Sequence, residues 1–383
     1  MALPQGYQLE TWVKSESTFD TATAFVATDA FYANEFKLDP ELKVNKSKEH
    51  TGSASLENHF EGKRGGKWST KCYVKPNAAG TAPDIGEILK AGFGTETVSG
   101  GTSVTYSFND NDPTSIQMAM KAGDGLYQSA FGAWVEQLDF EITGGQEPAI
   151  SASGGFASFG WAYSGTCGAT HGSGVSTVTL GAGQAGRFGV GGRVKFASDT
   201  NGGAGYLITA VNNSTPSITI SPSLVTGVTN GDAITPVSLS KTVGGTVAGG
   251  IACDLSIDGS SFGLISAKIS IKTGIHGLDK EATTNRASRI AKAMREISGE
   301  LQVYFIDTNH GIHLGRAWDM TTRNLVIRAG PNTAAQRMKI NLPKSLLMVS
   351  PVELPDAEEA TVTIKFESRK NAAAADECTV VFD

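Results

Sequence analysis

One glycine-rich motif in this sequence has the spacing of a cofactor-binding turn. Gly181, Gly183 and Gly186 match the G-x-G-x-x-G pattern of dinucleotide-binding proteins. That pattern needs a helix directly after the turn, so that the first backbone N–H groups meet the pyrophosphate. Residues 187–192 instead have the composition of a turn and a strand. We therefore predict that no cofactor binds there.

A second motif, from Gly259 to Gly263, has the G-x-S-x-G spacing of a nucleophile elbow, which also requires a helix after the serine. Apolar residues alternate over 265–271 as in a strand, so the serine is interpreted as a turn residue. His310 and His313 are spaced to share one helical face, but a catalytic zinc needs a further ligand, and no H-E-x-x-H motif is present. These patterns predict a protein that forms contacts, not an enzyme, with no metal and no cofactor.

The loop over 280–295 is a basic candidate site. Acidic residues Asp279 and Glu281 flank it, which favours a solvated or subunit-contacting loop over a phosphate-binding strip. The candidate subunit-contact residues are Arg286, Arg289, Lys292 and Arg295.

The composition excludes several classes of protein. The 383 residues include 46 glycines and only 18% charged residues, which favours short strands and tight turns over a coiled coil or helical repeat. A net charge of −6 argues against a dedicated nucleic-acid-binding protein. No signal peptide and no run of about 18 apolar residues is visible, so we expect no membrane insertion. The cysteines lack C-x-x-C spacing and are expected to be reduced thiols: Cys72, Cys167, Cys253 and Cys378.

Composition and periodicity divide the chain into four segments. Residues 1–50 are polar without a clean period and predict an N-terminal arm. Residues 51–155 and 244–383 alternate apolar and polar residues as strands do. Residues 156–243 are rich in glycine, serine, threonine and valine, and predict an inserted small β-barrel or sandwich. Its strands are expected near 175–180, 189–196, 206–211, 218–221 and 233–237.

The order of predicted elements repeats along the chain. Residues 53–74 predict a β-hairpin with its loop at Glu61–Gly66, followed by a short helix that a capping box from Asp84 to Glu87 opens and Gly94 helps to stop. After the glycine-rich segment come a strand, a polar loop, a second strand and a short helix over 311–318. The order at 53–142 and at 264–367 suggests an internal duplication. Further strands are predicted at 104–108, 116–120, 134–142, 265–271, 295–305, 325–328, 336–342 and 362–366.

Several stretches resemble the tail tube proteins of tailed bacteriophages. The resemblance covers about 52–155 and 251–383. The segments that carry it are Arg295–Phe305, Met338–Pro343, Val352–Phe366 and Ala133–Gly145, the last followed by Glu147-Pro148.

The resemblance implies a mainly β fold with two tube-like β-barrel or sandwich domains in one chain, each with a short helix, plus the inserted small β-domain. Tail tube subunits join strands into rings, the rings stack, and DNA passes through the lumen. Two such domains per chain imply a ring of three with pseudo-sixfold symmetry, with a hexamer as the alternative. The implied partners are other copies of the chain, the tail terminator, the distal tail protein and the tape measure protein. The implied location is the virion tail, assembled in the host cytoplasm.

A lumen that DNA passes without adhering should carry acidic or neutral polar side chains. The candidate lumen residues are Ser55, Glu57, Asp139 and Glu141. The sequence leaves open whether the same face, or instead a subunit contact, holds Lys67, Lys71, Lys268 and Lys272. Two other classes also remain open: a different virion component, such as a baseplate hub or decoration protein, and a β-rich adhesin or carbohydrate-binding protein.

Overall fold

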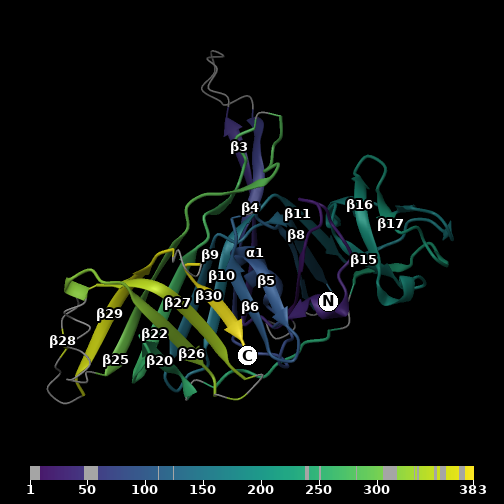
Figure 1. The fold of residues 1–383 in the computed structure, drawn as a ribbon. Coiled ribbons are helices and arrows are strands. Elements are labelled where there is room, and N and C mark those ends of the chain that lie inside the picture. The colour runs from purple at the N-terminus through teal and green to yellow at the C-terminus, as the bar shows by residue number, and fades with distance from the viewer. Residues whose placement is uncertain are drawn as a thin grey trace, which may run out of the picture.

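The computed structural model describes residues 9–46, 59–110, 112–123, 125–237, 241–249, 252–281, 283–304, 317–331, 333, 336–348, 352–353, 359–370 and 376–383. In these residues the chain is mainly β, and α1 (Gly86–Phe93) is the only complete α-helix. The strands form two related units with a small domain between them in sequence (Figure 1). We call β1 to β11 the first unit, β12 to β19 the small domain and β20 to β30 the second unit.

The strand bounds follow these three parts. The first unit contains β1 (Leu9–Ser15), β2 (Ala30–Phe31), β3 (Glu35–Lys46), β4 (His59–Tyr73), β5 (Gly94–Ser99), β6 (Ser103–Phe108), β7 (Ile116–Ala122), β8 (Leu126–Ala133), β9 (Gln137–Thr143), β10 (Ala149–Phe156) and β11 (Ser158–Tyr163). The small domain contains β12 (Gly165–Thr166), β13 (His171–Gly172), β14 (Thr177–Thr179), β15 (Arg193–Phe196), β16 (Tyr206–Asn212), β17 (Ser217–Ser221), β18 (Gly227–Val228) and β19 (Ala233–Pro236). The second unit contains β20 (Asp254–Ile257), β21 (Ser260–Phe262), β22 (Leu264–Lys272), β23 (Ile275–Gly277), β24 (Ile290–Lys292), β25 (Glu296–Tyr304), β26 (Arg323–Ala329), β27 (Met338–Leu347), β28 (Val352–Glu353), β29 (Thr361–Ser368) and β30 (Thr379–Phe382).

The two units have the same strand topology. In the first unit one layer has the order β3-β4-β10-β9, and the second unit repeats it as β22-β25-β29-β28. The other layer has the order β1-β7-β8-β11, which the second unit repeats as β20-β26-β27-β30. Every one of these pairings is antiparallel. The expected duplication is therefore present as a repeated topology, with described bounds of 9–163 and 254–382.

One glycine in each unit occupies the same packing environment. A Cβ on Gly66 of β4 would lie 2.5 Å from the Asp39 carbonyl oxygen and 2.2 Å from the ring of Phe156. A Cβ on Gly299 of β25 would lie 2.5 Å from both the Lys268 carbonyl oxygen and the ring of Phe366. The repeat therefore aligns Asp39 with Lys268 and fixes the equivalence of all neighbouring positions.

The long sheet joins the two units. β9 of the first unit pairs antiparallel with β22 of the second over Gln137–Thr143 and Ser266–Lys272, which gives the continuous run β3-β4-β10-β9-β22-β25-β29-β28. One hydrophobic core continues beneath both units. Within the described chain the run stays open, so the closed barrel expected for each half is not formed by one copy. The strands of the first unit belong to two sheets, whereas in the second unit β27 pairs with β29 over Ser345–Leu347 and so joins both sets of strands in one sheet.

Two predictions at the start of the chain are wrong. The predicted loop at Glu61–Gly66 lies inside the long strand β4, which pairs with β3 rather than with residues 53–60. The predicted arm is also part of the fold, because β1 pairs with β7 and the Trp12 side chain is fully buried. Tolerance of glycine explains the first error, since Gly66 leaves the space that the Phe156 ring fills.

The predicted helix is present, but its cap differs. α1 begins at Gly86 without a side-chain cap, and Gly94 ends it in the left-handed conformation at φ 101°. The Asp84 carboxylate accepts a hydrogen bond from the backbone of Gly244 instead (3.1 Å). Glu87 accepts hydrogen bonds from the backbone and hydroxyl of Ser15 in β1. These contacts attach the helix to β1 and to the segment that leaves the small domain. The helix predicted over 311–318 lies mostly outside the described residues.

The small domain has its own sheet, in the order β12-β19-β15-β16-β17-β14, and its core includes Phe188, Phe196 and Tyr206. The five strands predicted there are present: β14, β15 and β19 are shorter than predicted, and β16 and β17 are each one residue longer. Its core continues into the first unit through Trp12 and Tyr127, so the small domain packs on the layer of β1, β7 and β8.

Candidate functional site

The extended face of the long sheet is the main candidate site. Along β4, β10, β9, β22, β25 and β29, apolar residues such as Leu138 and Ile269 are buried, and the alternate residues point to the opposite face. Strand register places these alternate residues on one common surface, which we call the polar face. Its charged members are Glu35, Lys37, Asp39, Glu41, Lys67, Lys71, Asp139, Glu141, Lys268, Lys272, Glu296, Glu300, Lys365 and Glu367.

Charges of opposite sign alternate across this face. Lys71 Nζ lies 3.0 Å from the Glu141 carboxylate, and this hydrogen bond raises the pKa of Lys71. Lys272 pairs with Glu296 at 2.9 Å. Lys268 stands opposite Glu141 in one register and opposite Glu300 in the other. Because the pairs are exposed, each contributes at most about 1 kcal/mol to stability. Their main effect is to cancel one another's field.

The fourteen residues named above are six lysines and eight acids, so together they carry a net charge of −2. Gln137 donates to both carboxylate oxygens of Asp139, at 2.9 and 2.8 Å, which holds that acid on the surface. A polyanion meets a surface of mixed charge on which three of the named lysines, Lys37, Lys71 and Lys272, are already paired with acids, so it gains fewer of the phosphate contacts on which non-specific binding depends.

The predicted lumen residues have two different outcomes in the structure. Asp139 and Glu141 lie side by side with Ser270 and Lys268 on the polar face. Ser55 and Glu57 lie outside the described residues. The lysines whose location the sequence left open, Lys67, Lys71, Lys268 and Lys272, share this face with the acids.

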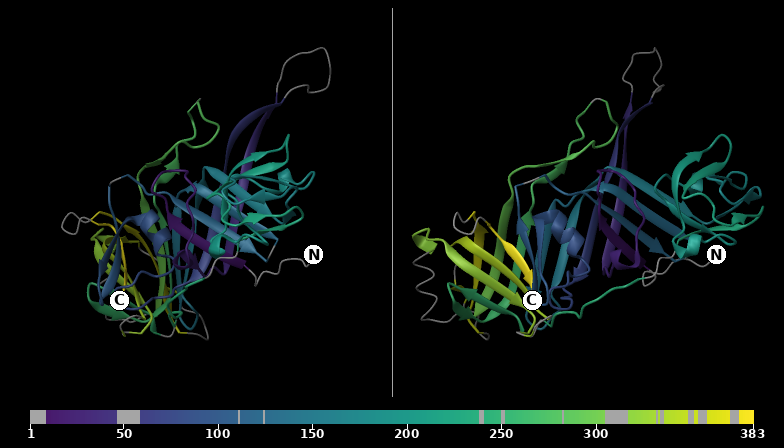
Figure 2. Two further views of the ribbon diagram at one scale, coloured as in Figure 1. Left: turned by 90° about the vertical axis from the view of Figure 1, so that its right-hand side faces the viewer. Right: turned by 45° about the vertical axis from the view of Figure 1, so that its right-hand side comes forward.

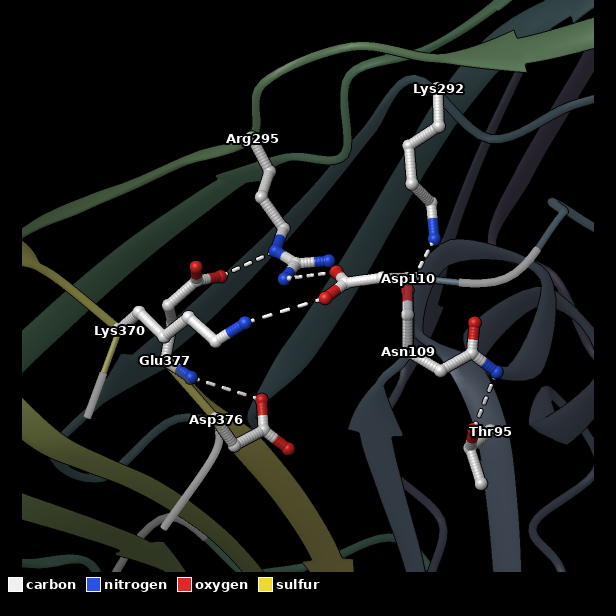
Figure 3. A network of polar contacts seen from close by, with 8 residues as sticks. All are labelled: Thr95, Asn109, Asp110, Lys292, Arg295, Lys370, Asp376 and Glu377. Atoms are coloured by element: carbon white, nitrogen blue, oxygen red, sulfur yellow. Dashed lines mark hydrogen bonds and ion pairs between the residues drawn. The ribbon is translucent and has the colours of Figure 1, made fainter. Parts of the chain in front are cut away.

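The four basic residues proposed as subunit contacts all make contacts inside the chain. Arg286 lies 3.2 Å from Asp20 in the first unit, and Arg289 lies 3.4 Å from Glu281. Arg295 pairs with Glu377 and with Asp110 (Figure 3). Its guanidinium also lies over the ring of Phe108. Lys292 donates to the Asn109 carbonyl at 2.6 Å, and burial lowers its pKa. Their role between subunits remains a prediction.

The contacts of Arg295 join the two units. Asp110 follows β6 of the first unit, whereas Lys370 and Glu377 flank the segment between β29 and β30 (Figure 3). Only 13% of the Arg295 side chain is exposed, but Asp110, which supplies the carboxylate from the first unit, is 72% exposed, so the ion pair between the units is a weak one. Together with the Arg295–Phe108 contact and the Lys292–Asn109 hydrogen bond, it links the two units at this point.

A buried carboxylate anchors the first unit near the same joint. Glu16 accepts hydrogen bonds from the backbone of Gly132 (2.8 Å) and Asp20 (3.1 Å) and from the Ser115 hydroxyl (2.6 Å). Burial nevertheless dominates and raises the pKa of Glu16 to about 7. Asp20, whose pKa burial also raises, contacts Arg286 of the second unit.

The hairpins of the two units project from the same side of the long sheet (Figure 2). Lys63 on β4 donates to the carbonyl oxygens of Glu281 and Thr284, each at 2.6 Å, and the backbone of Arg64 donates to Asn285. The first unit's hairpin therefore braces the extension that contains β23 and β24.

The two ends of the run have open strand edges in the described chain, at β3 and at β28. Leu42 and Val44 on β3 are 55% and 51% exposed, although both are apolar. The repeat aligns them with Ile271 and Thr273 of β22, which are 0% and 1% exposed because β9 covers that edge. The sequence carried a signal for this site, since Leu38 and Leu42 alternate with the charged residues of 37–43.

The motifs that resembled catalytic sites have no such geometry where they are described. The turn after Gly183 leads into a short 3-10 segment, Ala185–Arg187, and Ser261 lies within strand β21. His310 and His313 are outside the described residues. In the part of the chain that is described, no cluster of three His, Cys, Asp or Glu residues could hold a metal ion, and no helix is long and apolar enough to cross a membrane.

No protein-family model matches the sequence, and no curated protein is significantly similar to it. The geometry of the polar face and of the two open edges therefore carries the functional conclusion.

Proposed function

We propose that this chain is the structural subunit of a phage tail tube, in which copies close into a ring around the polar face and the rings stack into a conduit for DNA. The observation that carries the proposal is the junction between the units. β9 and β22 join two copies of one strand order, and the same two types of edge, β28 and β3, are left open at the ends of the run. If the β28 edge of each copy pairs with the β3 edge of the next, the internal junction is repeated between copies, and a set of copies can close into a ring.

The internal junction predicts the register between copies. Leu138 of β9 stands opposite Ile271 of β22. The repeat aligns Leu138 with Val352 and Ile271 with Leu42, so Val352 of one copy is expected opposite Leu42 of the next. This pairing removes both open edges, which would otherwise promote uncontrolled association.

The size of the ring favours three copies. Each copy supplies the eight strands of the run. Strands about 4.8 Å apart and tilted by about 40° give about 48 Å between opposite backbones for three copies and about 32 Å for two. Side chains narrow each value by roughly 10 Å, so two copies leave almost no clearance for a DNA duplex about 20 Å wide, whereas three copies leave ample room. Six copies would give about 96 Å, far more than one duplex needs.

The charge of the polar face favours a surface along which DNA moves over a surface that binds DNA. A ring of this face presents to the lumen a surface on which acids alternate with lysines and part of the lysines are paired, and DNA moves along it with little of the counterion release that drives adhesion. Terminator, distal tail and tape measure proteins are the partners that such a tube requires, and the virion tail is its location. Such a subunit is structural rather than catalytic.

Electron microscopy of the purified full-length chain, followed over a concentration series, tests the proposal. We expect rings or tubes with a central channel. A chain that stays monomeric at every concentration and salt condition, or that forms only solid aggregates, would refute it. A decoration protein, the main competing interpretation, would remain monomeric until it met a preformed capsid or tail.

A further inference from the structure

The two units differ at one edge of the second layer. In the second unit, the outer edge of β30 is covered by β6, which belongs to a hairpin that follows α1 of the first unit. Between Ala317–Trp318 and β26 the second unit has only residues 319–322, which are too few for an equivalent hairpin at that place.

The edge of the first unit that corresponds to β30 is β11, and the small domain covers it. Ala162 forms a bridge with Phe188, and the backbone of Gly189 donates to the Trp161 carbonyl at 2.8 Å. A Cβ on Gly160 would lie 2.6 Å from the Val190 carbonyl oxygen. The segment 188–190 therefore occupies on β11 the place that β6 occupies on β30.

Large apolar residues are exposed on the turn that precedes β26 and on the small-domain segment that covers β11. Trp318 and Met320 of the second unit are 78% and 68% exposed, and Val190 of the small domain is 55% exposed. Large apolar side chains of this kind are enriched at the centres of protein interfaces. Their neighbours are also complementary, since Asp319 lies beside Trp318 and Arg187 is exposed close to Val190.

We propose that the segment Ala317–Met320 of one copy packs against the small domain of the next copy, centred on Val190. The inference rests on the proposed ring, and it assigns the small domain to the subunit interface rather than to an independent outer surface. Inside one chain, the hairpin of β5 and β6 follows α1, and its strand β6 pairs with the edge of β30. The equivalent residues of the second unit meet the segment that borders β11 in the next copy.

The shape of the chain agrees with this contact. The small-domain strands β15, β16 and β17 lie at one end of the molecule, and β28 and β29 lie at the opposite end (Figures 1 and 2). When β28 pairs with β3 of the next copy, the end that carries the 317–320 turn faces the end that carries the small domain.

A site-specific photo-crosslink tests the contact. The full chain carries p-benzoylphenylalanine in place of Trp318, assembled particles are isolated and irradiated, and crosslinked dimers are digested with trypsin. We expect the crosslink on the peptide 188–193, which contains Val190. The matched control places the same group at Val98, an apolar residue of β5 that is 53% exposed, and we expect no link to that peptide.

Different results separate this inference from the proposed ring. Particles that form but crosslink elsewhere, or only within one chain, overturn the inference and leave the ring intact. Failure of the wild-type chain to form particles overturns both. As a second measurement, Val190→Asp places a carboxylate opposite Asp319 and is expected to raise the concentration needed for assembly by roughly tenfold or more. Unchanged assembly of this variant also overturns the inference.

Discussion

Replacing Leu42 with serine should weaken assembly without unfolding the chain. Leu42 is 55% exposed in the single copy, which corresponds to roughly 100 Å² of accessible, mostly apolar surface. Covering that area with β28 of the next copy contributes about 2.5 kcal/mol, at about 25 cal/mol per Å². The serine variant loses about 2 kcal/mol of this at each contact, or about 30-fold in affinity.

The assay compares the concentration at which rings appear for the wild type and for Leu42→Ser. Sedimentation velocity gives the assembled fraction, and urea unfolding of the dilute monomer reports its stability. We expect the threshold to rise at least about 30-fold. The unfolding midpoint should stay nearly constant, because surface substitutions change stability by only about 0.5 kcal/mol. Val225→Ser is the matched control, since Val225 is 57% exposed on the small domain.

Two results would contradict this reasoning. If Leu42→Ser assembles at the wild-type concentration, the β3 edge is not the contact between copies. If Leu42→Ser lowers the free energy of unfolding as much as a core substitution does, Leu42 is buried in the monomer, and its comparison with Ile271 fails.

Three further substitutions test the packing, the buried acid and the polar face. Gly299→Ala should destabilise the chain by about 1–3 kcal/mol in urea unfolding, because its Cβ meets a carbonyl oxygen and an aromatic ring, whereas Gly100→Ala, with no atom within 4 Å of the new Cβ, should not; equal midpoints for the two variants would contradict the packing. The pKa of Glu16 is raised to about 7, so wild-type stability should fall by about 3 kcal/mol as the pH rises from about 4.5 to 7, and Glu16→Gln should flatten that slope; an unchanged slope would assign the effect to another group. Combining Asp139→Lys with Glu141→Lys raises the net charge of the polar face by four, and assembled particles should then retain DNA in a salt-dependent manner; particles that still fail to retain DNA would contradict the lumen assignment.

The regular parts of the fold could be predicted from the sequence. Strict alternation of apolar and polar residues identifies β9 and β22, because each has one buried face and one solvated face. The order of elements also suggested the duplication, although the two units share little residue identity. Helix α1 was found from its apolar spacing and its terminal glycine, Gly94.

The errors have physical causes that lie far away in the sequence. Gly65 and Gly66 look like a hairpin loop, but Gly66 is in a strand because the Phe156 ring needs the space above it. Local spacing predicts that Asp84 caps α1, whereas the Asp84 carboxylate accepts a hydrogen bond from Gly244, which belongs to a distant segment. The first 50 residues lacked a clean period because Trp12 and Phe31 are buried within short pieces of strand.

The candidate site was partly predictable for a similar reason. Asp139 and Glu141 were identified because they lie on a clearly alternating strand. The location of Lys71 and Lys268 on the same face depends on the pairing of β4 with β10 within the first unit and of β9 with β22 between the units, which no local pattern encodes. Leu42 becomes informative only when it is compared with Ile271, its buried equivalent in the repeat.

The most direct test of the proposed tube is a reconstruction of the purified assembly by cryo-electron microscopy. We expect rings of three chains whose six units alternate around a channel, with β28 of each copy paired to β3 of the next and the polar face lining the lumen. Rings of six chains would contradict the copy number. A channel lined by any other surface, or β3 left unpaired in the assembled ring, would contradict the central claim.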